Sequence, residues 1–91
     1  MKRYLNLQNT FLIKDINMTQ EEYENWKLDK YHKAFVSALI DAIIFRKRFL
    51  YITPNHYNRF DRLRVKYNIN DALDAYPFIE KEATSIFNKR Y

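Results

Sequence analysis

Glycine is absent from this sequence of 91 residues. Tight turns that need a positive φ must therefore use Asn or be avoided. Short β-hairpin turns depend on glycine, so its absence disfavours an all-β fold that is rich in hairpins. The absence also excludes the glycine-rich loops that cradle phosphate groups in nucleotide-binding proteins.

Cysteine is absent as well, which excludes a disulfide framework and any thiolate metal site. The first residues, MKRYLNLQNT, lack the sustained apolar stretch and small-residue cleavage site of a secretory signal peptide. No uncharged run approaches the roughly 18–20 residues that are needed to cross a bilayer. We therefore expect no membrane association, and a chain without cysteine fits a cytoplasmic location.

Residues that commonly perform catalysis are few. The histidines and serines are His32, His56, Ser37 and Ser85, and no His-Glu-x-x-His metal pattern occurs. Asp71 and Asp74 lie three residues apart, but at the start of an expected helix, where the helix dipole favours acids. His56 falls on an apolar face and is expected to be packed there. The sequence predicts a protein that is not an enzyme and has no cofactor or metal.

The most apolar stretch is AFVSALIDAIIFRKRFLYI, residues 34–52. From 34 to 45 only Ser37 and Asp41 are polar, and a helix that is apolar nearly all round is usually buried on several sides. A central helix is therefore predicted from about Lys30. Helical spacings of 4, 4 and 7 residues separate Lys33, Ser37, Asp41 and Arg48. These four residues therefore form one narrow polar strip along the helix.

Asp41 is the unusual residue of this helix, because a buried carboxylate is costly unless it is paired or hydrogen-bonded. Two explanations are open. The polar strip can reach solvent or Asp41 can pair with an arginine such as Arg64. Alternatively, Asp41 is a specificity residue at a self-association surface, in which case the chain is a homodimer.

The expected helix boundaries come from capping residues. Thr19 and Glu22 are expected to form a capping box at the start of one helix. A break is expected at Asp29-Lys30, because a single helix from 19 to 53 would be about 50 Å long, which is too long for a compact domain of this size. The alternative is a protruding helix that dimerises. Thr53-Pro54 ends the central helix and begins the next. The segment 48–52 has strand-like composition and could instead be extended.

The last helix is predicted from Asp71 to about Arg90. Asn68 is expected in the left-handed conformation, and Asn70 is expected to cap this helix. Its apolar positions keep one helical phase across Pro77, so we predict one helix with Pro77 on the solvent side. The fold prediction is a single all-α domain over residues 1–91, a small bundle of about four helices. Residues 1–17 are a less regular N-terminal arm, which could be extended, a short strand or a first helical turn.

Positive charge is concentrated between residues 46 and 66, a segment that contains seven Lys or Arg and only one acidic residue. Six of these cations are the candidate binding residues: Arg46, Lys47, Arg48, Arg59, Arg62 and Lys66. Because the two groups are joined by a short turn, we expect them to lie at one end of the domain. Tyr51 and Tyr57 are candidate interface aromatics, since arginine interleaved with tyrosine suits phosphate contacts and base stacking.

The net charge of +5 favours an acidic partner, either nucleic acid or an acidic protein surface. The first functional hypothesis is a small regulatory protein that binds nucleic acid with little sequence specificity. The alternative is an inhibitor or adaptor of the phage or mobile-element type that docks on a host protein, such as a nucleic-acid-handling or defence complex. A basic face that is merely solvated, or a purely structural helical oligomer, would also fit the sequence.

Overall fold

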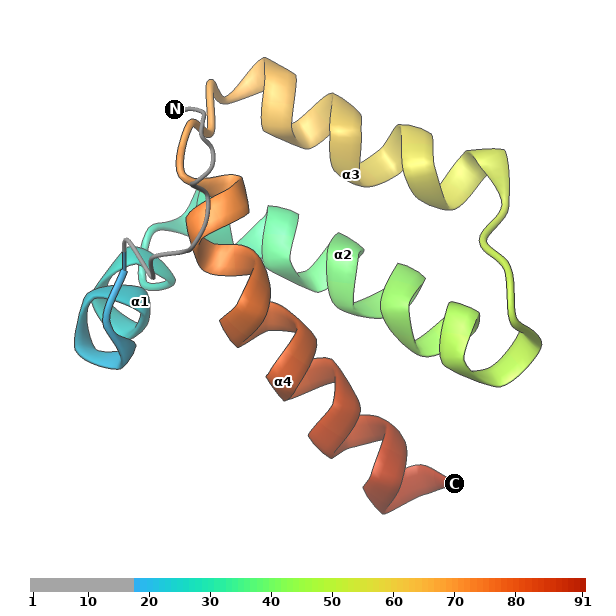
Figure 1. The fold of residues 1–91 in the computed structure, drawn as a ribbon. Helices are drawn as coiled ribbons and strands as arrows, with labels where there is room; N and C mark the ends of the chain where they lie inside the picture. Colours follow the sequence, from blue (N-terminus) through green and yellow to red (C-terminus); the bar gives the residue numbers. More distant parts are fainter. Residues whose placement is uncertain (1–17) are drawn as a thin grey trace, which may run out of the picture.

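The computed structural model describes residues 18–91 and shows that this part of the chain is all-α (Figure 1). Its helices are α1 (Gln20–Trp26), α2 (Lys30–Phe49), α3 (Pro54–Lys66) and α4 (Ala72–Arg90). No strand occurs among the described residues. The prediction of an all-α bundle is confirmed, while the expectation for residues 1–17 lies outside the described part of the chain.

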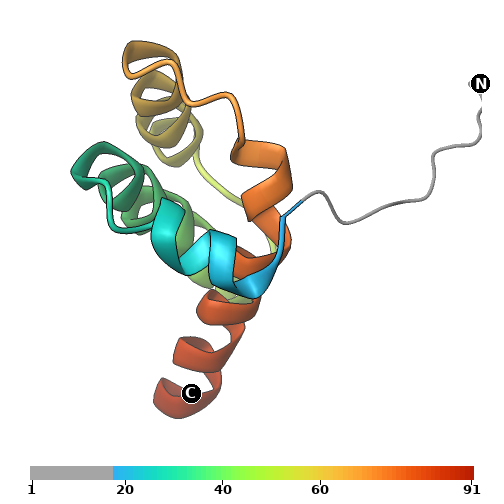
Figure 2. The same cartoon turned by 90° about the vertical axis from the view of Figure 1, so that its left-hand side faces the viewer.

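Helix α2 occupies the centre of the arrangement, and both α3 and α4 pack against it. Helix α3 runs back along α2 in the opposite direction, whereas α4 crosses α2 at an angle and diverges from α3 (Figure 1). The turned view in Figure 2 shows the same separation of α3 and α4. Helix α1 is short and packs against α4.

The predicted helix starts are confirmed at three of four places. The Thr19 hydroxyl accepts a hydrogen bond from Glu22 N at 3.1 Å, and Thr19 N donates to Glu22 Oε1 at 2.8 Å. Asp29 Oδ1 accepts from the backbone of both Tyr31 and His32, so the expected break before α2 is present. At α3, Thr53 caps and Pro54 is at the first turn, where its missing N–H costs nothing.

The predicted cap of α4 at Asn70 is wrong, and the helix starts one residue after the predicted Asp71. The helix begins at Ala72, and its flanking residue Asp71 makes no side-chain capping bond. The turn before it nevertheless uses Asn68 with a φ of 54°, as expected where glycine is missing. Pro77 is exposed and lies inside one continuous helix, which confirms the reading of a single helix across it.

The extended alternative for residues 48–52 is wrong for its first part, because α2 continues to Phe49. Leu50 then ends the helix in the left-handed region, with a φ of 68°, and its N–H bonds to Arg46 O at 2.7 Å. This position would usually hold glycine. A sequence without glycine places a leucine there, and that leucine is exposed.

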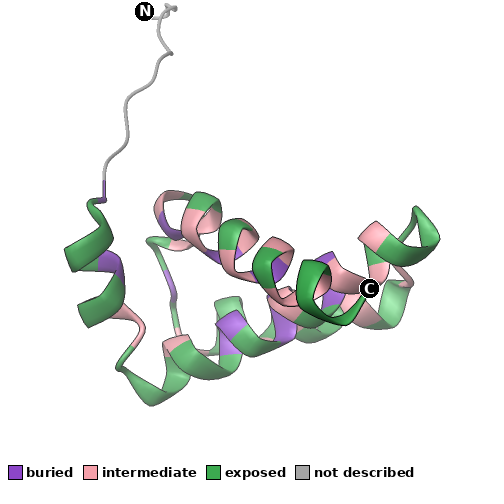
Figure 3. Ribbon diagram, turned by 90° about the horizontal axis from the view of Figure 1, so that it is seen from below, coloured by how far each residue is buried: buried purple, intermediate pink, exposed green. Residues whose placement is uncertain are grey.

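The core lies where α2 meets α4 and α1, and the outer faces of the helices are exposed (Figure 3). Ala75, Ile79 and Ala83 form the buried stripe of α4. Tyr23 of α1 is fully buried and stacks on Phe78, with ring centroids 5.0 Å apart. Small residues on α4 let the helices approach closely, while Tyr23 fixes α1 in place.

Polar contacts between α1 and α4 surround Tyr23. Lys27 Nζ lies 2.8 Å from Glu82 Oε2, and this hydrogen bond is the main cause that raises the pKa of Lys27. Burial, and after it the Glu82 carboxylate, raise the pKa of Tyr23 far above its ordinary value of 10.0. The Tyr23 hydroxyl has no well-formed hydrogen bond among the described residues, so burial is the main cause that raises its pKa.

Within residues 18–91, no helix combines the length and the apolar character that crossing a bilayer requires.

Candidate functional site

The antiparallel pairing of α2 and α3 determines where the predicted basic residues lie. Phe45 contacts His56 at one end, with ring centroids 4.4 Å apart, and Tyr31 stacks on Tyr67 at the other, at 4.2 Å. Lys66 is therefore level with the start of α2. From Tyr31 to Arg48, α2 rises about 25 Å at ~1.5 Å per residue. The structure does not bring Lys66 to the end where Arg46, Lys47 and Arg48 lie.

Two of the predicted cations are paired with carboxylates. Arg59 Nη1 donates to Asp41 Oδ2 at 3.1 Å, across the α2–α3 contact. Arg46 Nη2 lies 3.9 Å from Glu80 and 3.5 Å from the hydroxyl of Tyr76. These pairs reduce the positive potential on the middle of α3 and at the last turn of α2. Arg62 is exposed on α3.

Asp41 is exposed, with 55% of its side chain accessible, so no charge is buried in α2. Lys33, Ser37 and Arg48 are also exposed, which confirms that the polar strip reaches solvent. Asp41 pairs with an arginine, as expected, but the partner is Arg59 and not Arg64. Arg64 bonds instead to Asp61, three residues earlier, at 2.8 Å. Because Asp41 is solvated and paired with Arg59, its presence does not require a self-association surface.

The C-terminal ends of α2 and α4 meet at the same end of the molecule. Arg48 Nη1 donates to the hydroxyl of Tyr91 at 2.9 Å, and its Cζ lies 4.6 Å from the centroid of that ring. This contact holds the C-terminal end of α4, which carries Lys89 and Arg90, near the last turn of α2. The Lys89 side chain lies on the outer face of α4 together with Pro77 and Lys81. We call this cluster the basic end, and its members are Arg46, Lys47, Arg48, Lys89 and Arg90.

Four of the five cations in the basic end have no carboxylate within 4 Å in the described part of the chain; these are Lys47, Arg48, Lys89 and Arg90. Cations in the last turn of a helix also complement its dipole, by about 0.3–1 kcal/mol each. Here two helices contribute such a turn to one surface. The sequence reading missed Lys89 and Arg90, because nothing local in the sequence shows where α4 ends in space.

Exposed aromatic rings surround the basic end. Arg48 contacts two of them, with its Cζ 5.2 Å from the centroid of Phe49 and 4.6 Å from that of Tyr91. Tyr51 is exposed in the following loop and makes an edge contact with Phe45 at 5.4 Å. Of the two predicted interface aromatics, Tyr51 therefore lies near the cluster.

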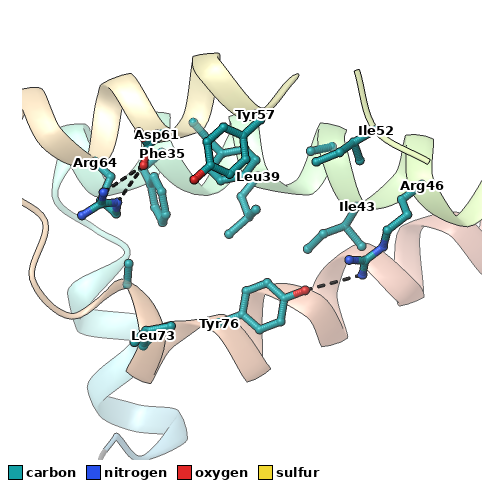
Figure 4. A pocket seen from close by; sticks show the side chains of 13 residues that line it. Phe35, Leu39, Ile43, Arg46, Ile52, Tyr57, Asp61, Arg64, Leu73 and Tyr76 are labelled. Atoms are coloured by element: carbon teal, nitrogen blue, oxygen red, sulfur yellow. Dashed lines mark hydrogen bonds and ion pairs between the residues drawn. The ribbon is translucent and has the colours of Figure 1, made fainter. Parts of the chain in front are cut away.

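Tyr57 is exposed but belongs to a different feature, an apolar groove of about 300 Å³ between α3 and α4 (Figure 4). Buried residues of α2 form its floor: Phe35, Leu39, Ala42 and Ile43. One wall is Tyr57, Phe60, Asp61 and Arg64 of α3, and the other is Ala72, Leu73 and Tyr76 of α4. Ile52 and Arg46 line the remaining end. We call this space the groove.

Both histidines have structural contacts. The ring of His56 packs on Phe45, and its Nδ1 lies 2.7 Å from the hydroxyl of Thr53 and completes the cap of α3. His32 stacks on Trp26, and its Nδ1 lies 2.8 Å from Trp26 O. The expectation of a packed His56 is confirmed. No group of three or more possible metal ligands occurs among residues 18–91.

Comparisons with protein-family models, with curated proteins and with solved structures found no match to this chain.

Proposed function

We propose that this protein is a small binding protein that holds single-stranded nucleic acid at the basic end. One observation carries the proposal. The C-terminal turns of α2 and α4 are joined by Arg48 and Tyr91, and they carry four cations with no carboxylate within 4 Å among residues 18–91. Exposed aromatic rings lie at or next to the same turns, and Arg48 contacts two of them. Proteins that bind single strands without strong sequence preference combine the same two elements, a positive surface for the backbone and rings for the bases.

Each side chain has a distinct part in this proposal. Lys47, Lys89 and Arg90 supply positive charge for phosphate groups. The guanidinium of Arg48 lies over the Tyr91 ring, and a guanidinium held on a ring offers a planar donor to phosphate and a face for a base. Tyr51 is accessible for stacking on the same end. The proposal involves no hydrogen bonds between side chains and the edges of the bases, so the preference for particular nucleotide sequences is expected to be weak.

The salt dependence of binding tests this proposal. A fluorescent single-stranded oligonucleotide of about 20 nucleotides is titrated with the protein at several salt concentrations. For single strands the logarithm of the binding constant falls by about 0.7 for each phosphate contact per tenfold rise in salt. Four contacts predict a slope of about −3, with a dissociation constant in the micromolar range at ~50 mM salt.

A pair of charge-matched variants locates the surface. Replacing Lys89 and Arg90 by alanine removes two contacts, and the slope is expected to fall to about −1.5. Replacing Lys30 and Lys66, which are exposed at the opposite end of the α2–α3 pair, removes the same charge and should leave the slope unchanged. Equal losses in both variants would mean that net charge alone drives binding. Absent binding by the unmodified protein at low salt would reject the proposal.

Docking on another protein is the second candidate function, and the groove is the observation that favours it. Its walls belong to helices that both pack on α2 but diverge from each other, so an apolar surface stays open between them. Helix-binding proteins commonly use such a surface between helices. The groove is a different surface from the basic end, and Arg46 is the one residue that the two features share.

A further inference from the structure

We propose that the groove binds an amphipathic helix of a partner protein, with apolar side chains on the groove floor and a carboxylate at Arg46. This inference rests on the second candidate function and names its surface and its partner class. It concerns the groove and not the four other cations of the basic end, and only Arg46 belongs to both. The argument uses the shape of the groove, its apolar lining and the distribution of charge along it.

The groove has the dimensions of a helix contact. Its floor runs along α2 from Phe35 to Arg46, which corresponds to about 16 Å at ~1.5 Å per residue. That length matches about three turns of a partner helix, with anchors spaced at i, i+4 and i+7. The described residues include no strand, so a partner cannot bind them by adding a strand to an existing sheet edge.

The volume and lining of the groove favour apolar anchors. A volume of about 300 Å³ holds on the order of ten water molecules at ~30 Å³ each. Those waters face phenyl, leucine and isoleucine side chains, so their release by apolar groups is favourable. Leu73 is 88% exposed on the α4 wall. Figure 4 shows it across the groove from Asp61 and Arg64, where an entering helix would cover it.

Charge along the groove is uneven, and this determines which end of the partner carries the acid. Asp61 and Arg64 neutralise each other at one end, through two hydrogen bonds of 3.2 and 2.8 Å. Arg46 lies at the other end, where only its Nη2 is engaged among the described residues, by a long contact to Tyr76 and a longer one to Glu80. Its remaining N–H groups suit a carboxylate, which guanidinium binds through two donors.

The test begins with the selection of displayed helical peptides of about 15 residues, with randomised faces, on the whole protein. The selected peptides are expected to share apolar residues at i, i+4 and i+7 and an acid at one end. The best one is then synthesised with its acid as Glu and as Gln. Fluorescence anisotropy is expected to give about fivefold tighter binding for the Glu peptide, an exposed-pair effect.

Three variants show whether the groove is responsible. Leu73→Glu is expected to weaken both peptides at least about tenfold, because it places a charge on the apolar wall. Arg46→Gln is expected to abolish the preference for Glu while keeping the binding of the Gln peptide. Leu28→Glu is the matched control, since Leu28 is 74% exposed in the α1–α2 connection, outside the groove. It should bind as the unmodified protein does, and circular dichroism checks that all variants are folded.

Several results would overturn the inference. These are the absence of any enriched peptide, enrichment of basic or uncharged peptides, or equal loss of binding in the Leu28→Glu control. A dimer in light scattering that dissociates in Leu73→Glu would assign the groove to a second copy of this chain. Displacement of the peptide by a single-stranded oligonucleotide would assign it to nucleic acid. Loss of oligonucleotide binding alone would reject the proposed function of the basic end and leave this inference standing.

Discussion

The guanidinium of Arg48 lies over the ring of Tyr91, with its Cζ 4.6 Å from the ring centroid, and it donates a hydrogen bond to the hydroxyl of that residue at 2.9 Å. The contact joins the last turn of α2 to the end of α4, across 43 positions of sequence. Both side chains are exposed. It is the contact that creates the basic end.

The first prediction concerns the two parts of this contact. Tyr91→Ala removes the ring and is expected to lower the free energy of unfolding by about 0.5–1 kcal/mol, the usual value for an exposed cation–π contact. Tyr91→Phe keeps the ring and loses only an exposed hydrogen bond, so the change should stay below about 0.5 kcal/mol. Urea unfolding followed by circular dichroism measures both. A Phe variant as unstable as the Ala variant would show that the hydroxyl is the main contributor.

The second prediction concerns the left-handed residue that ends α2. A non-glycine residue in this conformation raises the free energy of the folded protein by roughly 1–2 kcal/mol. Glycine also lowers the free energy of the unfolded chain by about 0.4–1 kcal/mol, because it increases that chain's conformational entropy. Leu50→Gly should therefore stabilise the protein by about 0.5–1 kcal/mol. Leu28 is similarly exposed but has no positive φ, so Leu28→Gly should not stabilise. Thermal unfolding of the two variants compares them directly, and a destabilised Leu50→Gly variant would contradict the strain argument.

The third prediction concerns acid stability and Asp29. Its bonds from the backbone N–H groups of His32 and Tyr31 lower its pKa from the ordinary value of 3.8. Because the folded pKa is below the unfolded one, the carboxylate stabilises the fold above pH about 3.8. That contribution is lost as the pH falls through the folded pKa. Asp29→Asn keeps a capping oxygen but does not titrate, so its stability should decline less between pH 5 and about pH 2.

Measurements at two pH values separate this effect from the loss of the cap itself. Asp29→Ala removes both the charge and the capping oxygen, and it should be less stable than the unmodified protein already at pH 7. Urea unfolding at pH 7 and at low pH gives both comparisons. An acid dependence in Asp29→Asn as steep as that of the unmodified protein would mean that other groups dominate.

The fourth prediction concerns Asp41 and Arg59. Their pair is short, at 3.1 Å, but both side chains are more than half exposed. Exposed ion pairs contribute about 0.2–1 kcal/mol, so Asp41→Ala should cost less than about 1 kcal/mol. Ser37→Ala, on the same exposed strip of α2, gives the baseline for a substitution on this face. A double-mutant cycle with Arg59→Ala measures the pair itself, and a loss above about 2 kcal/mol would mean that Asp41 is desolvated in solution.

Much of the fold was predictable because it depends on local chemistry. The caps at Thr19, Asp29 and Thr53 were read from side chains that accept hydrogen bonds from backbone N–H groups only a few residues away. The central position of α2 followed from its apolar surface. The misplaced cap at Asn70 has the same origin, because Asn70 and Asp71 are both acceptable before a helix and the sequence does not rank them.

The candidate sites were less predictable. Arg59 and Arg64 lie five residues apart, and either could reach the central helix from the next one. The orientation of α3 about its own axis, relative to α2, determines that Arg59 pairs with Asp41 and that Arg64 bonds to Asp61. The basic residues were expected to gather at one end because a short turn joins them, but the antiparallel course of α3 carries Lys66 to the opposite end.

The sequence by itself determined that the described chain is helical, where most of its helices begin, and that a left-handed turn without glycine falls to Asn68. These features depend on contacts over a few residues, which composition and spacing encode directly. The tertiary structure alone decided the crossing of α4 over α2. That crossing brings the C-terminal end of α4 to Arg48 and opens the groove beside α3. It results from the packing of Ala75, Ile79 and Ala83 on α2 and α1, a long-range fit that no local pattern specifies.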